Sequence, residues 1–580
     1  MTDPAAHRMT PAQGSAQPAG HATDIALASW QRVHEALAEL PDLDRLGLTE
    51  LFRALAARPE RVAQLQQRYY EQHRALWESV VADREVSAVA TPAASDHRFD
   101  SDAWTTLPFF RLLKQVYLIN SAWLTDLVEA AALPPAQARR VAFVVRQALD
   151  ALAPTNFPAS NPEVIELAAR TRGASLMEGL RHLRADAARG RMAMTDESAF
   201  EVGRNLAVTR GAVVYENPVA QLIQYAPLTP QVYSRPLLVI PPFINKYYIL
   251  DLRPENSFVR YALHQGHQVF MISWRNADSE LERATWDDYA THGVLEPLDA
   301  MLEITGARAA NMLGFCVGGT LLASTLATMP RPQRAASATL LATMLDFSDV
   351  GDIGAYVDEA YVQQCEAQYR EGGLMPGRRL ADAFASLRAN ELVWRFLIEN
   401  YLKGRTPPAF DLLYWNSDSA NLPAPLFTWY LRNMYLENNL RVPGKLRVLG
   451  RPVDLGRIVA PAYILATRED HIVPWTSAFA STELLGGRMQ FVLGASGHIA
   501  GVINPAAQGK RCHWVGPAGA ATAQEWLERA TCKPGSWWPH WSSWLKRRAG
   551  RRVQAIPAVG SSKHPPTEPA PGRYVLERAG

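Results

Sequence analysis

The sequence predicts an α/β fold that follows an all-helical region and is interrupted by a late insertion. Apolar residues recur with a helical period up to about residue 200, and beyond residue 205 short β-like runs alternate with helices. Such alternation predicts a parallel sheet that is covered by helices on both faces. A chain of 580 residues is also longer than one hydrophobic core usually serves, so we expect more than one domain.

The composition is that of a soluble globular protein, with 48% hydrophobic and 20% charged residues. A net charge of +2 argues against nucleic acid as a partner. Residues 1–22 lack the apolar segment of a secretory signal, and no apolar run is long enough to predict a transmembrane segment. Four cysteines without a C-x-x-C spacing predict neither a disulfide framework nor a metal site, which favours a reducing cytoplasm.

The first part of the chain is expected to contain no chemistry of its own. Residues 1–25 are rich in Pro, Ala, Gly and Thr, and we expect them to be disordered. Residues 26–200 are expected to form a helical N-terminal domain, with amphipathic helices over 61–80, 109–132 and 137–152. Without a polar cluster, the expected roles of this domain are packing, dimerisation or contacts with a partner.

Residues 201–580 are expected to form the second domain. Between about residues 346 and 443 the alternation of strands and helices stops, which indicates a cap insertion, either a lid that excludes water or a structural addition. From about residue 545 we expect an extended, solvated tail. A tryptophan cluster before this tail fits a packed C-terminal helix or, alternatively, an apolar contact surface. The cluster is Trp537, Trp538, Trp541 and Trp544. The expected strands are 212–215, 221–225, 236–240, 268–274, 309–315, 338–345, 461–467 and 489–493, and the helices between them are 256–265, 286–304 and 321–329.

One short stretch indicates a reactive site. In Gly314-Phe-Cys-Val-Gly318, a cysteine stands between two glycines where an apolar strand meets a helix. Strand, Gly-x-nucleophile-x-Gly and helix form the nucleophile elbow of α/β-hydrolases, with Cys316 in place of the usual serine. Small neighbours let the strand and the helix approach closely around a strained turn. A buried structural cysteine between turn glycines is the alternative.

A site of this kind needs an acid and then a histidine downstream of the nucleophile. Asp470 follows a buried strand and is the candidate acid, with Glu469 as its local competitor. His498 follows the next predicted strand, 28 residues later (498 − 470), and is the candidate base. We expect structural roles for three other histidines. His471 lies in the loop of the acid, and His264 and His267 precede the strand 268–274, at the opposite end of the sheet from the elbow.

Each member of this set has a chemical task. A free thiol has a reference pKa of about 8.5, so it needs a histidine to remove its proton at neutral pH. The carboxylate fixes the tautomer of the imidazole and balances its charge. The oxyanion needs two N–H donors, and Val317 at the start of the helix is expected to supply one. Phe243 is expected to supply the other, because Pro241 and Pro242 have no N–H.

The sulfur of Cys316 at the elbow favours one type of acyl reaction over another. Attack of a thiolate on a thioester exchanges like for like, so the acyl group stays activated. Its transfer to an alcohol is then downhill. Cysteine therefore favours acyl transfer to a hydroxyl over hydrolysis.

Six separated stretches of the sequence carry a family resemblance. In order and content they resemble polyhydroxyalkanoate synthases, and the chain length and the Phe-Cys-Val elbow are similar to the class I, single-subunit kind. The resemblance extends from about residue 100 into the C-terminal Pro-Ala-Pro-Gly-Arg-Tyr-Val segment. The stretches are Pro241-Pro-Phe-Ile-Asn-Lys-Tyr-Tyr-Ile-Leu-Asp-Leu252, Ser273-Trp-Arg-Asn276, Gly314-Phe-Cys-Val-Gly-Gly-Thr320, Asp411-Leu-Leu-Tyr-Trp-Asn416, Arg468-Glu-Asp-His-Ile-Val-Pro-Trp475 and Gly497-His-Ile-Ala-Gly501.

The resemblance implies an α/β-hydrolase core that polymerises (R)-3-hydroxyacyl-CoA, with short-chain substrates such as 3-hydroxybutyryl-CoA expected, and that releases CoA without a cofactor or metal. Matched residue by residue, Cys316 is the nucleophile, His498 is the general base, and Asp470 helps to activate the 3-hydroxyl of the incoming acyl group, either through the histidine or directly. The resemblance also implies a homodimer at the surface of cytoplasmic polyester granules. The growing polyester chain and granule-associated proteins are then its partners, and the N-terminal domain makes the dimer and granule contacts.

The sequence departs from the family pattern in two places. Family members often carry a cysteine in Val-Cys-Gly near the end of the cap. This chain has Val448-Leu449-Gly450 there, so a catalytic role proposed for that cysteine does not apply to it. Some relatives have another side chain at Phe243, which a backbone donor tolerates. Two alternatives stay open: a hydrolase of the same fold, either a thioesterase or a polyester depolymerase, and a non-catalytic granule-coating protein.

Overall fold

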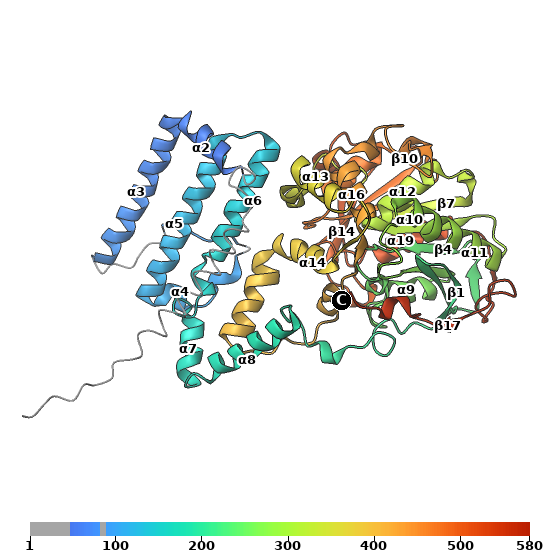
Figure 1. Cartoon of the computed structure of the whole chain (residues 1–580), viewed down its shortest axis with the longest axis horizontal. Helices are drawn as coiled ribbons and strands as arrows, with labels where there is room; N and C mark the ends of the chain where they lie inside the picture. Colours follow the sequence, from blue (N-terminus) through green and yellow to red (C-terminus); the bar gives the residue numbers. More distant parts are fainter. Residues whose placement is uncertain (1–46, 82–88, 95, 580) are drawn as a thin grey trace, which may run out of the picture.

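The computed structural model describes residues 47–81, 89–94 and 96–579. Helices α2 to α8 form an N-terminal lobe beside a larger lobe that is built on a β-sheet (Figure 1). The last helix of the N-terminal lobe ends at Arg189 and the first strand begins at Gly211. The disorder predicted for residues 1–25 lies outside the described residues.

The N-terminal lobe is a set of amphipathic helices with two small buried clusters, one around Val141 and one around Trp104. Pro108 and Pro135 are the first residues of α5 and α6, a position where the missing N–H costs no hydrogen bond. The three helices predicted for this region are confirmed. The helices are α2 (Leu48–Ala56), α3 (Pro59–Val81), α4 (Ala103–Thr106), α5 (Pro108–Ala131), α6 (Pro135–Ala151), α7 (Pro162–Arg170) and α8 (Ala174–Arg189).

The large lobe contains a sheet of eleven strands in the order β15-β14-β13-β12-β7-β6-β4-β5-β2-β1-β17. The strands from β13 to β5 in this order are parallel, as predicted, whereas both margins are antiparallel. β7 ends at Leu341, earlier than predicted, because Ala342 turns the chain with a φ of 43°. The strands are β1 (Gly211–Glu216), β2 (Ala220–Tyr225), β4 (Leu237–Ile240), β5 (Val269–Trp274), β6 (Ala310–Phe315), β7 (Ala335–Leu341), β12 (Ala462–Thr467), β13 (Met489–Gly494), β14 (Cys512–Val515), β15 (Thr531–Pro534) and β17 (Glu568–Pro569).

Helices cover both faces of the sheet, and each face has its own buried apolar cluster. The tryptophans of the predicted C-terminal cluster are all 4% exposed or less, so the packed-helix interpretation is confirmed and the contact-surface alternative is wrong. One face carries α10 (Trp286–Ala290), the π-helix η5 (Thr291–Leu295), α11 (Glu296–Thr305), α12 (Val317–Thr328), α17 (Trp475–Ala480) and α18 (Ala523–Arg529), and the other carries α9 (Phe258–His264) and α19 (Trp538–Lys546).

The residues after Trp544 are mostly exposed or half-buried, as predicted, but they pair with the core and do not form a free extension. β16 (Arg552–Gln554) pairs with β3 (Gln231–Tyr233), and β17 extends the main sheet beside β1. Further on, Val575 is buried and its carbonyl accepts from Nζ of Lys246 at 3.0 Å. The prediction missed this pairing because the contacts join very short strands to distant residues, and a local pattern of Pro, Gly and Arg does not reveal such contacts.

The predicted cap insertion follows β7 and precedes β12. Its longest helical stretch begins at α14 and runs beside α6, α7 and α8 of the N-terminal lobe (Figure 1). The backbones of α8 and the cap pack closely at Gly179. A Cβ at this position would lie 1.8 Å from the carbonyl oxygen of Tyr401, so only glycine fits there. The cap elements are η7 (Gly351–Tyr356), α13 (Glu359–Gln368), β8 (Leu374–Met375), α14 (Gly377–Ser386), the π-helices η8 (Asn390–Trp394) and η9 (Leu397–Leu402), α15 (Asp411–Ser417), β9 (Leu422–Pro423), α16 (Ala424–Tyr430), the π-helix η10 (Leu431–Leu436) and η11 (Asn439–Arg441).

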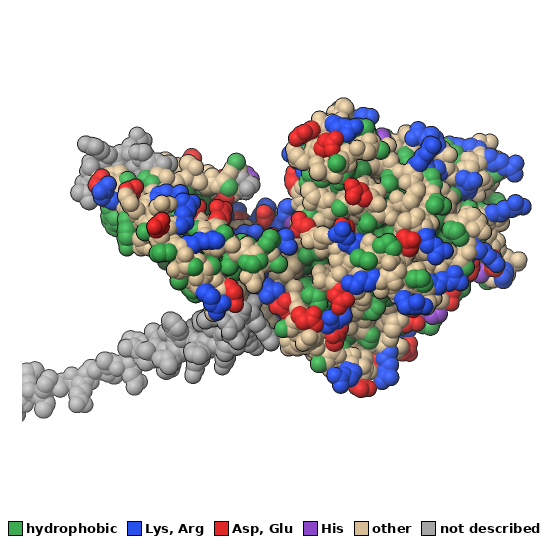
Figure 2. Space-filling model, turned by 90° about the horizontal axis from the view of Figure 1, so that it is seen from above, with side chains coloured by type: hydrophobic (Ala, Val, Ile, Leu, Met, Phe, Trp, Pro, Cys, Tyr) green, Lys and Arg blue, Asp and Glu red, His purple; other side chains and the backbone are tan. Residues whose placement is uncertain are grey.

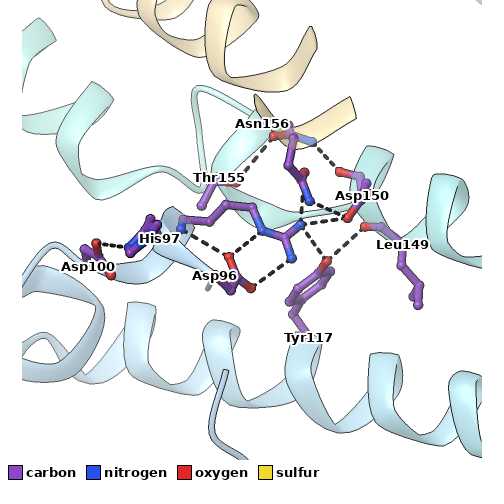
Figure 3. A network of polar contacts seen from close by, with 10 residues as sticks. Asp96, His97, Asp100, Tyr117, Leu149, Asp150, Thr155 and Asn156 are labelled. Atoms are coloured by element: carbon purple, nitrogen blue, oxygen red, sulfur yellow. Dashed lines mark hydrogen bonds and ion pairs between the residues drawn. The ribbon is translucent and has the colours of Figure 1, made fainter. Parts of the chain in front are cut away.

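A polar network around Arg98 ties the N-terminal lobe together and reaches the cap (Figure 3). The Arg98 guanidinium donates to both oxygens of Asp96, each at 2.9 Å, and to Oδ1 of Asp150 at 3.2 Å. The same Asp150 oxygen accepts from Nδ2 of Asn390 in the cap at 2.7 Å. Burial opposes the charge of Asp96, but Arg98 holds the pKa of this carboxyl below its usual range. The network therefore depends on one guanidinium.

We expect Arg98→Ala to lower the free energy of unfolding of the N-terminal lobe by about 3 kcal/mol, because it leaves two partly buried carboxylates without their cation. Chemical denaturation of the full chain measures the effect. The matched control is Arg74→Ala, which removes an exposed pair with Glu78 and should cost less than about 0.5 kcal/mol. Equal denaturation midpoints for the two variants would contradict the role of the network.

Candidate active site

The elbow lies where β6 ends and α12 begins. Cys316 has φ 52° and ψ −128°, a backbone conformation that a residue with a Cβ adopts only under strain. Its N–H donates to the carbonyl of Leu341 on neighbouring β7 at 2.9 Å, which holds the turn against the sheet. Cys316 remains partly exposed, in contrast to the alternative of a buried structural cysteine.

Close packing explains the small residues around Cys316. A Cβ on Gly314 would lie 2.4 Å from Cα of Gly319, and a Cβ on Gly319 would lie 2.0 Å from Oγ1 of Thr343. A Cβ on Gly318 would lie 2.5 Å from the carbonyl oxygen of Pro241. The start of α12 is therefore pressed against β6 on one side and against the loop after β4 on the other.

Asp470 and His498 lie in the loops after β12 and β13, which are neighbouring parallel strands. Oδ2 of Asp470 and Nδ1 of His498 are 2.7 Å apart. Oδ2 also accepts from the Thr467 hydroxyl at 3.0 Å, and Oδ1 accepts from the N–H groups of Ile472 and Val473 at 2.9 and 2.8 Å. With a side-chain exposure of 0%, this carboxylate makes its contacts inside the protein and is aimed at the imidazole.

The charges of the three predicted residues support one another. Burial favours the neutral form of both ring and carboxyl. The attraction between them outweighs burial, so the pKa of Asp470 is held below its usual range and the pKa of His498 is raised well above its usual value. Cys316 contributes to the raised pKa of His498, both through its charge and as a hydrogen-bond partner. The structure thus brings Cys316, His498 and Asp470 together.

The competing residues stand apart from this chain of contacts. Glu469 is exposed, and its carbonyl accepts from the Arg388 side chain. Burial and the charge of Arg388 lower the pKa of His471 to about 4, and its Nδ1 has no hydrogen-bond partner in the described part of the chain. His267 is buried before β5 with its ring stacked on Tyr233. These surroundings agree with the structural roles expected for the two histidines.

Two backbone N–H groups near the elbow are available to a ligand. Val317 is the first residue of α12, and Phe243 follows the two prolines after β4. Neither N–H donates to an acceptor among the described residues. The tight contact between Gly318 and Pro241 sets the start of α12 beside the loop that carries Phe243. The Phe243 ring is buried, in edge-to-face contact with Tyr289 at 5.1 Å.

Several of the sequence motifs meet around the loop after β4. Nε1 of Trp274 donates to the carbonyl of Pro241 at 2.9 Å, and Nε1 of Trp415 donates to the carbonyl of Lys246 at 2.7 Å. The Lys246 ammonium in turn donates to the carbonyl of Val575 in the C-terminal segment. These motifs therefore share one task, which is to fix the loop that faces the elbow.

Tyr430 and Tyr435 of the cap lie beside the elbow and were not predicted from the sequence. Their rings meet edge-to-face at 5.4 Å, and both pack on Phe347. Burial raises the pKa of each hydroxyl, and the charge of Cys316 adds to the shift. Tyr435 lies in the π-helix η10, and a spacing of five residues joins side chains on one face only in such a helix. Neither an α-helical nor a strand period pairs them.

No group of three or more His, Cys, Asp or Glu side chains in the described ranges gathers where it could hold a metal ion. No helix in this part of the chain has both the length and the apolar character that crossing a membrane requires.

Comparison with known proteins places this chain in a family. Residues 95–262 match the family model described as the poly-beta-hydroxybutyrate polymerase (PhaC) N-terminus, and residues 236–505 match the alpha/beta hydrolase fold. A poly(3-hydroxyalkanoate) polymerase subunit PhaC from Cupriavidus necator is 48% identical, over 94% of this chain and 92% of the relative. The same-named protein of Rhizobium meliloti is 43% identical over 87% of this chain and 84% of the relative.

A poly(3-hydroxyalkanoate) polymerase from Methylorubrum extorquens is 39% identical, over 97% of this chain and 94% of the relative. Such identity over nearly the whole length of both chains favours a polyester synthase over the two alternatives left open, a hydrolase of the same fold and a non-catalytic granule-coating protein. The elbow, the helical lobe and the relatives agree: this chain belongs to the poly(3-hydroxyalkanoate) polymerases, which are polyester synthases with an α/β-hydrolase core.

Proposed function

We propose that Cys316 carries the acyl group as a covalent thioester. The observation that supports this is the contact chain from Asp470 through His498 to Cys316 at a strained elbow. His498 takes the thiol proton, and the thiolate attacks the carbonyl carbon of a hydroxyacyl-CoA. The bond between this carbon and the CoA sulfur then breaks, and CoA leaves with the proton from His498. The N–H groups of Val317 and Phe243 stabilise the oxyanion.

Chain growth needs an alcohol as the nucleophile, which is a far weaker acid than a thiol. The 3-hydroxyl of an incoming hydroxyacyl-CoA gives its proton to His498 while its oxygen attacks the Cys316 thioester. An ester bond forms and the thiol is released. Asp470 acts through His498, since its side chain has no exposed surface and accepts hydrogen bonds from protein groups on both oxygens. Its burial supports action through the basicity of His498 over direct contact with the hydroxyl.

One thiol is enough for this cycle. The product of the ester-forming step is an elongated acyl-CoA, and its acyl group returns to Cys316 with release of CoA. The other cysteines are poor candidates for a second carrier, because Cys365 is buried and Cys512 and Cys532 lie on marginal strands of the sheet. Leu449 occupies the position where family members often have a further cysteine.

The family assignment also leads us to propose the substrate, the oligomeric state and the location of the protein in the cell. We expect a short-chain (R)-3-hydroxyacyl-CoA as substrate, no cofactor or metal, and a homodimer at the surface of cytoplasmic polyester granules with granule-associated proteins as neighbours. Apolar side chains at the surface of the N-terminal lobe (Figure 2) support such contacts. The most exposed large ones on α2, α3 and the start of α5 are Phe52, Tyr70, Trp77 and Phe109.

Cys316→Ala should reduce CoA release from 3-hydroxybutyryl-CoA by at least about 10³-fold, because no other group can accept the acyl chain. A thiol-reactive dye that counts free CoA measures the rate. Cys512→Ala and Cys532→Ala are the matched controls and should keep the rate of the unchanged chain. CoA release at the native rate from Cys316→Ala would refute the assignment.

Asp470→Asn should leave acylation of Cys316 largely intact and slow elongation by about 100-fold or more, because the alcohol needs the stronger base that the carboxylate supports. The rate of the first CoA release, compared with the steady rate and the polymer recovered, separates these steps. An equal loss in both steps would favour a role confined to orienting His498.

A further inference from the structure

An apolar cavity of about 390 Å³ lies between three parts of the chain that are distant in sequence. The core contributes Phe243, the cap contributes Tyr430 and Tyr435 among others, and α6 of the N-terminal lobe contributes Phe143 and Val144. The volume falls in the range of about 300–1,000 Å³ that ligand sites occupy. A helix outside the hydrolase core therefore forms one wall of this cavity.

One side of the cavity adjoins the candidate active site. Phe243 is the first residue with an N–H after β4, and its ring lines the cavity. Tyr430 and Tyr435 also line it, and both are close enough to Cys316 for its charge to act on their hydroxyls. The cavity thus extends from Phe243, in the loop that packs on the start of α12, to α6.

Ion pairs and packing fasten α6 to the cap. Gln147 donates to the carbonyl of Ser386 at the end of α14 at 2.8 Å, and the Phe143 ring packs edge-to-face on Tyr356 at 5.3 Å. The aspartates that pair with α6 all lie in the first part of the cap. The pairs are Arg139–Asp349 at 3.5 Å, Arg140–Asp358 at 3.0 Å and Arg146–Asp352 at 2.7 Å. The wall that α6 provides is therefore a fixed part of the cavity.

The lining selects the chemistry of the ligand. Aliphatic and aromatic side chains dominate it, which suits an uncharged chain and not the phosphates of CoA. The polar groups that line it have protein partners, since Arg140 pairs with Asp358 and the Tyr356 hydroxyl bonds the Ser386 hydroxyl. An aliphatic polyester matches this lining, because it is uncharged and mostly apolar along its length.

We propose that this cavity holds the first units of the acyl chain that grows on Cys316, and that Phe143 and Val144 of α6 are specificity-determining residues that set the room for it. The inference rests on the proposed thioester at Cys316. It gives the N-terminal lobe a direct contact with the reacting chain, through one helix face.

The test compares Val144→Trp, which fills the cavity, with Ala142→Trp, which adds the same group to an exposed position of the same helix. Two substrates separate the steps. Butyryl-CoA has no 3-hydroxyl, so it acylates Cys316 without elongation, and both variants should release one CoA per chain as the unchanged protein does. With 3-hydroxybutyryl-CoA, Val144→Trp should lower steady CoA release by at least about tenfold and shorten the polymer, and Ala142→Trp should change neither.

Elongation by Val144→Trp at the unchanged rate and polymer length would overturn the inference and leave the thioester proposal standing. Absence of the single CoA release from butyryl-CoA in the unchanged protein would overturn the thioester proposal and this inference with it. Val144→Ala provides a second variant that does not strain the fold. It should raise the rate with a six-carbon hydroxyacyl-CoA relative to the four-carbon one, and an unaltered ratio would contradict the role of α6.

Discussion

The backbone at Cys316 keeps its strained conformation because the close packing of α12 against β6 and the loop after β4 constrains the turn between them. Glycines at 314, 318 and 319 let α12 press against β6, Thr343 and the loop after β4, with no space for a Cβ at any of the three positions. The same contacts place the sulfur at the carboxyl edge of the parallel strands, where the loops after β12 and β13 present Asp470 and His498. Each functional group near the elbow therefore depends on this close approach of helix and sheet.

Burial makes the electrostatics of the site effective. A carboxylate without solvent exposure costs free energy unless it is hydrogen-bonded and paired, and Asp470 has donors on both oxygens and a histidine beside it. The cap supplies the remaining cover through Tyr430 and Tyr435. Because the cap is also fastened to α6 and, through Asn390, to the Arg98 network, the helical lobe and the site form one connected structure. This connection gives the N-terminal lobe a physical means of acting on the reaction.

The sequence alone was sufficient to predict the candidate site, because there a local pattern and a topological rule agree. The glycines around Cys316 require a tight turn, and the order of strands then assigns Asp470 and His498 from the loops that follow them. Long-range contacts were beyond such reasoning. The C-terminal residues join the sheet through strands of two or three residues, Tyr430 and Tyr435 meet through a π-helix, and Val144 lines a cavity with residues more than 200 positions away. None of these long-range contacts produces a periodic pattern of residues in the sequence.

The most direct test of the central claim is the mass of the protein after reaction with butyryl-CoA, followed by peptide mapping. The account predicts one butyryl group per chain, located on the peptide that contains Cys316 and labile to hydroxylamine, as a thioester is. A chain without the added mass, or with the butyryl group on Cys365, Cys512 or Cys532, would contradict the account.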